Sequence, residues 1–176
     1  GRRVVAQLLQ QQKPVRALVR NPEKAKEVLD TGNPLLQVMV ADLSEYHTQS
    51  TANILEQAVQ GCDCIISVSG ALRFSQMTDF LPWRLGNADV SAWAPPSHPY
   101  YTNYQAHCLL IDLAQQYNIE RFVRLTGGTV GFSAFNPFVI LMSAMLSMTT
   151  RYHFLTEQYL RESKVPYMIV RPGGLM

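Results

Sequence analysis

Continuous apolar runs alternate along this chain with segments whose apolar residues recur at helical spacing. The runs predict strands near residues 14–20, 36–41, 63–69, 120–126 and 166–171. The spaced segments predict helices over residues 1–12, 22–30, 100–117 and 151–162, with a further apolar segment at 137–148. Another helix is predicted where Ile54, Leu55, Ala58 and Val59 share one face. Strands that alternate with helices and are apolar throughout are typical of a parallel sheet covered on both faces. We therefore predict an α/β fold with a doubly wound parallel sheet.

The chain opens on Gly1 and a helix, with no strand before it. In a dinucleotide-binding βαβ unit, this helix follows a first strand and a glycine-rich loop. We therefore expect an N-terminally truncated Rossmann-type domain, a fragment that lacks that strand and loop. The sheet should then have a gap between the strands near residues 17 and 66. Residues 1–176 are predicted to form one domain, with an irregular insertion at 72–99.

Composition narrows the range of partners. The net charge is +2 and the basic residues are scattered, so neither a nucleic-acid surface nor a polybasic membrane tail is indicated. The apolar run 138–148 is shorter than the roughly 20 residues of a membrane-spanning helix. The three cysteines, Cys62, Cys64 and Cys108, lack the spacing of a metal site, and no metal is expected. Oligomeric state and compartment, cytoplasmic or organellar, stay open.

Four motifs occur in a characteristic order: ALVRNPEKA, VMVADL, NYQAHCLLIDLAQQYNIERFVRLTG and EQYLRESKVPYMIVRPGGL. Together they resemble the atypical short-chain dehydrogenase/reductase family, in its NmrA-like NAD(P)-binding branch. The resemblance covers nearly the whole chain except about 72–99. It implies a Rossmann fold, a bound dinucleotide and a small organic substrate of unknown identity.

The resemblance also assigns residues to the cofactor. Gly1 matches the third glycine of the glycine-rich loop, beside a helix N-terminus that suits a pyrophosphate. Arg20 ends the second strand of the unit without a neighbouring acid, which favours NADP over NAD; a solvated charge is the alternative. The full set of expected contacts is Gly1, Arg20, Asp42, Leu43, Ser67, Ser69, Gly70, Thr126, Pro172 and Gly173. For Asp42 the alternative is a helix cap or turn residue, and for 171–174 a simple strand-terminating turn.

Catalysis is where the chain departs from the family. Short-chain reductases use a Tyr-x-x-x-Lys pair, but those two positions fall on Thr149 and His153. The remaining catalytic candidates are His153, the adjacent Tyr152, and Thr126 after the fourth predicted strand. A packing histidine is the alternative. The sequence therefore predicts an NADP-dependent oxidoreductase, with a non-catalytic redox sensor or scaffold as the alternative and epimerase or isomerase chemistry as a weaker third.

Overall fold

The structure, a computed structural model, describes residues 1–76, 90, 94–133 and 135–173. Its strands are β1 (Val15–Val19), β2 (Leu36–Val40), β3 (Cys64–Ser67), β4 (Arg121–Leu125) and β5 (Tyr167–Val170). Its α-helices are α1 (Arg2–Gln10), α2 (Pro22–Val28), α3 (Gln49–Val59), α5 (Ala106–Gln116), α6 (Pro137–Met145) and α7 (Thr149–Glu162). The shorter turns are η1 (Leu43–Glu45), η3 (Tyr100–Gln105) and η4 (Gly128–Gly131). All five predicted strands are confirmed.

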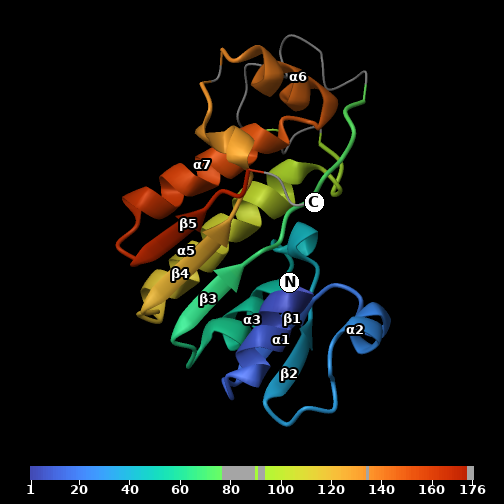
Figure 1. The fold of residues 1–176 in the computed structure, drawn as a ribbon, viewed down its shortest axis with the longest axis vertical. Coiled ribbons are helices and arrows are strands. Elements are labelled where there is room, and N and C mark those ends of the chain that lie inside the picture. The colour runs from blue at the N-terminus through green and yellow to red at the C-terminus, as the bar shows by residue number, and fades with distance from the viewer. Residues whose placement is uncertain (77–89, 91–93, 134, 174–176) are drawn as a thin grey trace.

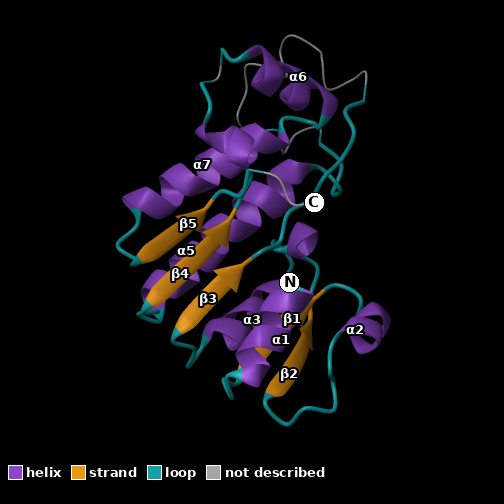
Figure 2. Ribbon diagram, in the orientation of Figure 1, coloured by secondary structure: helices purple, strands orange, loops and turns teal. Residues whose placement is uncertain are grey.

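The strands form two parallel sheets, β1-β2 and β3-β4-β5 (Figure 2). In the first, Ala17 pairs with Val38; in the second, Ile66 pairs with Val123. No described strand pairs with both β1 and β3, so the predicted gap between these strands is confirmed. The carboxyl ends of all five strands point the same way, as a Rossmann-type arrangement requires.

Successive residues of β1 show that helices cover both faces of the sheet at this strand. The buried side chain of Ala17 packs against Leu9 of α1. The next residue, Leu18, points to the opposite face and packs against the main core. On that second face the Arg16 guanidinium donates to the Gln57 carbonyl oxygen (3.1 Å) at the end of α3. The sheet is therefore doubly wound, as the sequence predicts.

The main core lies between β4 and the helices α3, α5 and α7. Leu55, Ile111, Phe122 and Leu160 are wholly buried there, one from each of these four elements. Burying a side chain of this size stabilises the fold by about 1.5–3 kcal/mol. This packing fixes α5 and α7 side by side against the three-stranded sheet, where both helices reach its carboxyl edge (Figure 1).

The helix at 100–117 differs from the prediction in its first turns. Residues 100–105 form a π-helix, η3, before the α-helix α5 begins. The wholly buried Asn103 accepts a hydrogen bond from Ala71 N (2.7 Å) and donates one to Ala71 O (2.9 Å). The wider turn therefore accompanies an amide that pairs with the backbone of the chain leaving β3. π-helical turns recur at functional sites.

The segment after β4 also ends differently from the prediction. The apolar segment 137–148 is helical only to Met145, because Ser147 and Met148 adopt positive φ angles (45° and 56°) and end the helix.

Of the expected insertion at 72–99, residues 77–89 and 91–93 lie outside the described part. In the described part, no helix has the length and apolarity needed to cross a membrane.

Candidate functional site

Polar side chains meet at the carboxyl ends of β3 and β4. Arg124, near the end of β4, donates through one terminal nitrogen to Ser67 Oγ and to the carbonyl oxygen of Ser69, both at 2.8 Å. Its other terminal nitrogen donates to Nδ1 of His153 on α7 (3.1 Å). One guanidinium thus joins the end of β3 to the helix that carries the leading catalytic candidate.

A second histidine continues this network from α5. The Ser67 hydroxyl lies 2.7 Å from His107 Nε2, and the Ser69 hydroxyl lies 3.2 Å from the same atom. On the other side of the ring, Nδ1 donates to the carbonyl oxygen of Thr102 (2.7 Å) in η3. Burial and the Arg124 charge lower the pKa of His107 well below its ordinary value, so this histidine is neutral.

Arg124 occupies a position where an apolar residue is expected. It lies two residues after Phe122 on the same face of β4, and both side chains are wholly buried. Burial lowers the pKa of Arg124 to about 10, against the attraction of Glu157, so the guanidinium remains charged at neutral pH. Its Nε has no hydrogen-bond partner in the described structure. A buried charge with an unpaired donor is costly, which makes this position a candidate for a functional role.

His153 lies on the first half of α7 with its ring against the chain leaving β3. A Cβ placed on Gly70 would lie 3.5 Å from Cε1 and 3.7 Å from Nε2 of this ring. Burial, followed by the charge of Arg124, lowers the pKa of His153 to about 3, although Glu157 opposes the change. His153 is therefore neutral across the physiological range.

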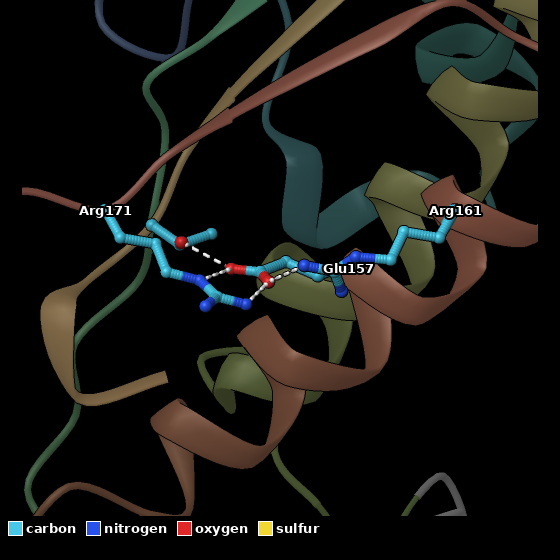
Figure 3. Close-up of polar contacts among 4 residues, drawn as sticks. Glu157, Arg161 and Arg171 are labelled. Carbon is cyan, nitrogen blue, oxygen red and sulfur yellow. Dashed lines mark hydrogen bonds and ion pairs between the residues drawn. The ribbon is translucent and has the colours of Figure 1, made fainter. Parts of the chain in front are cut away.

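A third group of polar contacts joins the ends of β4 and β5 to α7 (Figure 3). The buried carboxylate of Glu157 accepts hydrogen bonds from Thr126 Oγ1 (2.6 Å), Arg161 (3.0 Å) and Arg171, whose Nε lies at 3.1 Å and which adds a second bond. Burial raises the pKa of Glu157, but the bonds from Arg171, Thr126 and Arg161 outweigh it and hold the pKa below its ordinary value. The carboxylate is therefore ionised.

The chain leaving β5 packs closely on the chain leaving β4. The amide of Gly128 donates to the carbonyl oxygen of Pro172 (3.1 Å). A Cβ on Gly128 would lie 3.1 Å from that oxygen and 3.2 Å from Gly173 Cα. These contacts place Thr126, Pro172 and Gly173 at one edge, beside the Glu157 contacts.

The expected phosphate and ribose contacts lie at the same edge of β1 and β2. Gly1 caps α1, and a Cβ on it would lie 3.4 Å from Val68 Cγ2, next to the chain leaving β3. Arg20 is exposed at the end of β1. Asp42 accepts from the backbone nitrogen (2.9 Å) and hydroxyl (2.8 Å) of Ser44, so it caps η1.

The residues around α1 fit a bound dinucleotide. The first turn of α1 contains no acidic residue, and it carries the exposed Arg2 and Arg3. Free amide groups and cations at a helix N-terminus suit a pyrophosphate.

Beside η1, a hollow of about 400 Å³ is lined by Ser44, Tyr46, His47, Pro96 and Tyr101. The Leu43 side chain packs on the main core instead.

Two of the catalytic candidates are engaged in other contacts. Tyr152 is wholly buried and packs edge-on against Tyr100 and His98 (centroids 5.6 and 5.5 Å apart). Packing accounts for this tyrosine, and a catalytic role for it stays a prediction. Thr126 is bonded to Glu157, and Thr149, in the family's tyrosine position, donates to the Leu146 carbonyl oxygen (2.6 Å). His153 bonds Arg124 through Nδ1, and its Nε2 has no hydrogen-bond partner among the described residues.

The sequence analysis did not single out four residues that are central to the site: Asn103, His107, Arg124 and Glu157. A signal existed only for Arg124, since a charged residue in phase with Phe122 contradicts the apolar face of a strand. No group of three or more potential ligands for a metal occurs within the described residues.

The fold and the site define a Rossmann-type domain that binds a dinucleotide at the carboxyl edge of a parallel sheet. Comparison with known families agrees with this class. The family that matches residues 1–176 is described as NAD(P)H-binding. The chain belongs to this family.

Individual relatives resemble the chain more distantly. An uncharacterised chloroplastic protein of Arabidopsis thaliana is 28% identical over 180 residues, which cover 99% of this chain and 55% of that protein. The chain therefore spans about half the length of this curated relative. The anaerobilin reductase ChuY of Escherichia coli O157:H7 has a TM-score of 0.65 at 22% identity, covering 99% of this chain and 67% of ChuY. An NADPH-dependent quinone oxidoreductase of Escherichia coli has a TM-score of 0.57 at 18% identity, covering 99% and 44%.

Proposed function

We propose that this protein is an NADP(H)-dependent oxidoreductase that reduces a small organic carbonyl or quinone. The observation that carries the proposal is His153, bonded to the buried Arg124 at the carboxyl ends of β3 and β4. In a doubly wound fold this edge is where a dinucleotide and its substrate meet. By name, one similar structure is a reductase and another a quinone oxidoreductase, which is compatible with this chemistry.

NADP is proposed over NAD because of the end of β1. Arg20 is exposed there, and the following Asn21 accepts from Lys24 N (2.9 Å) as the N-cap of α2. No carboxylate occupies either position, whereas an NAD-binding protein commonly has one that bonds the ribose 2′-hydroxyl. Arg20 and Lys24 would instead attract a 2′-phosphate.

The cofactor, when bound, supplies the hydride. The chain's own residues would hold it: the N-terminus of α1 would face the pyrophosphate, and the loop after β5 would lie at the nicotinamide end. His153 directs Nε2 toward the chain leaving β3, where it would bond the substrate oxygen. The Arg124 charge behind the ring favours negative charge developing on that oxygen.

The proposal is tested by cofactor titration and turnover. NADPH should bind stoichiometrically in a calorimetric titration and be oxidised with some member of a panel of aldehydes, ketones and quinones. His153→Ala should lower kcat by about a hundredfold while NADPH affinity stays within about twofold, as for loss of one group that stabilises developing charge. Gln158→Ala, an exposed neighbour on α7, is the control and should match the wild type.

A second function, a non-catalytic NADP(H) sensor or scaffold, is favoured by one observation. The tyrosine and lysine positions of the family hold Thr149 and His153, and Thr149 is buried in a bond to Leu146. Stoichiometric NADPH binding with no turnover on the whole panel would select this alternative over the oxidoreductase.

A further inference from the structure

We infer that Arg124 is a positioning residue that holds His153 as the neutral tautomer with its proton on Nε2. The site then presents an uncharged hydrogen-bond donor instead of the lysine cation of the family. This inference deepens the proposed oxidoreductase function and rests on it for its role in the reaction. The state of the ring itself is a property of the protein alone, so it is measured independently of turnover.

The argument begins with the chemistry of the two side chains. A guanidinium has only donors, so the bond between Arg124 and His153 Nδ1 (3.1 Å) requires a lone pair on Nδ1. A neutral imidazole that accepts at Nδ1 carries its proton at Nε2. Because Arg124 is also anchored to Ser67 and Ser69 at 2.8 Å each, its fork cannot turn away from the ring without breaking those bonds.

The opposite arrangement at His107 shows that the network assigns each proton. There Nδ1 faces the Thr102 carbonyl oxygen and must donate, so Nε2 accepts from the Ser67 hydroxyl. Ser67 in turn accepts from Arg124. The two neutral histidines therefore carry their protons on opposite nitrogens, and Arg124 lies between them.

The charges around His153 also favour the neutral form of its ring. The ionisable groups that face it are Arg124 from β4, His107 from α5 and Glu157 from its own helix. Glu157 is engaged by Arg161 and Arg171, so its attraction for a second cation is partly balanced. Burial and the Arg124 charge prevail and keep the ring neutral.

The donor faces the place where a substrate would lie. Gly70 follows β3, and a side chain there would contact Cε1 and Nε2 of His153. No described residue accepts a hydrogen bond from Nε2. A neutral N–H at this point can bond an oxygen that gains negative charge during hydride transfer, without giving up its proton in the ground state. This chemistry fits carbonyl and quinone substrates.

The test is a long-range ¹H–¹⁵N spectrum of protein labelled with ¹⁵N-histidine, recorded between pH 5 and 8. His153→Ala identifies the His153 signals, and His107 is the internal reference for the other tautomer. The wild type should show His153 as the Nε2–H tautomer with no titration in this range. Arg124→Met should introduce the second tautomer or a titration, and should lower kcat about a hundredfold with little change in the KM for NADPH. Arg121→Met, at an exposed position of β4, is the control.

Arg124→Lys keeps a donor and a charge at the same point and should retain the neutral Nε2–H form, even if Arg124→Met does not fold. A wild-type His153 that is protonated at pH 6 to 7, or that carries its proton on Nδ1, overturns the inference. So does a folded Arg124→Met protein whose His153 signals are unchanged. The predicted tautomer without turnover on any substrate supports the role of Arg124 and rejects the oxidoreductase instead.

Discussion

Glu157 offers the sharpest test of how the carboxyl edge is held together. Its wholly buried carboxylate receives hydrogen bonds from Thr126, Arg161 and Arg171, and so joins β4, β5 and α7 (Figure 3). In Glu157→Gln the shape of the side chain is kept but the charge is lost. One carboxylate oxygen is replaced by an NH₂ group, which cannot accept from either arginine.

The magnitude follows from the exposure of the arginines. Breaking a buried ion pair by removing one partner costs about 3–5 kcal/mol. The Arg161 and Arg171 side chains are 38% and 31% exposed, so water can partly solvate them when Glu157 is lost. The lower end, about 3 kcal/mol, is therefore expected. For a domain of this size, this corresponds to a decrease in Tm of about 6–12 °C.

The assay is thermal unfolding followed by circular dichroism at pH 7, with and without NADPH. Glu162→Gln is the matched control, because Glu162 ends the same helix in an exposed position and has no hydrogen bond or ion pair in the described structure. It should change the free energy of unfolding by less than about 0.5 kcal/mol. If Glu157→Gln melts within about 1 °C of the wild type, the Glu157 contacts do not hold this edge and the reasoning fails.

Three further predictions follow from the same edge. Because the pKa of Glu157 is lowered, the contribution of its carboxylate to stability is complete above the ordinary pKa of 4.5 and is lost as the pH falls below that value. The Tm difference between wild type and Glu157→Gln should therefore be constant from pH 5.5 to 8 and shrink below pH 4.5. Arg20→Asp should reduce NADPH affinity about tenfold to a hundredfold with little effect on NADH affinity. Lys13→Asp, at the other end of β1, should leave NADPH affinity unchanged. Equal affinities of the wild type for the two cofactors in a titration would contradict this prediction. Gly128→Ala should destabilise the fold by about 1–3 kcal/mol, because its Cβ would lie 3.1 Å from a backbone oxygen of the loop after β5. Gly32→Ala, whose Cβ would have its nearest atom at 3.7 Å, is the control and should be tolerated. Equal midpoints of the two variants in a denaturant titration would refute the close packing at Gly128.

Much of the fold was determined by local pattern alone. The apolar runs predicted all five strands, because continuous apolar runs bounded by turn residues are typical of strands in a parallel sheet. The start of α2 is also a local feature: Asn21 accepts a hydrogen bond from Lys24 N as the N-cap, and Pro22 opens the first turn. The order of motifs gave the family, and the position of the first helix gave the gap between β1 and β3.

Local pattern was insufficient where a residue's role depends on distant partners. The start of the helix at 100–117 has ordinary helical spacing, yet η3 is π-helical where Asn103 pairs with Ala71, 32 residues away. The sequence also placed Tyr152 beside His153 as a candidate, whereas the two side chains lie in different surroundings. Adjacent residues on a helix point about 100° apart, so one enters the aromatic cluster and the other faces the chain leaving β3.

The site itself was decided by the tertiary structure. The proposed role of Arg124 depends on its hydrogen bonds to Ser67, 57 residues before it, and to His153, 29 residues after it. Glu157 likewise depends on Thr126 and Arg171, which parallel strands bring to one edge. Burial changes the protonation of these groups far more than their sequence neighbours do, because the cost of charge depends on the surrounding solvent and partners. The sequence identified His153 as a candidate, and the packing around it decided that its ring is neutral.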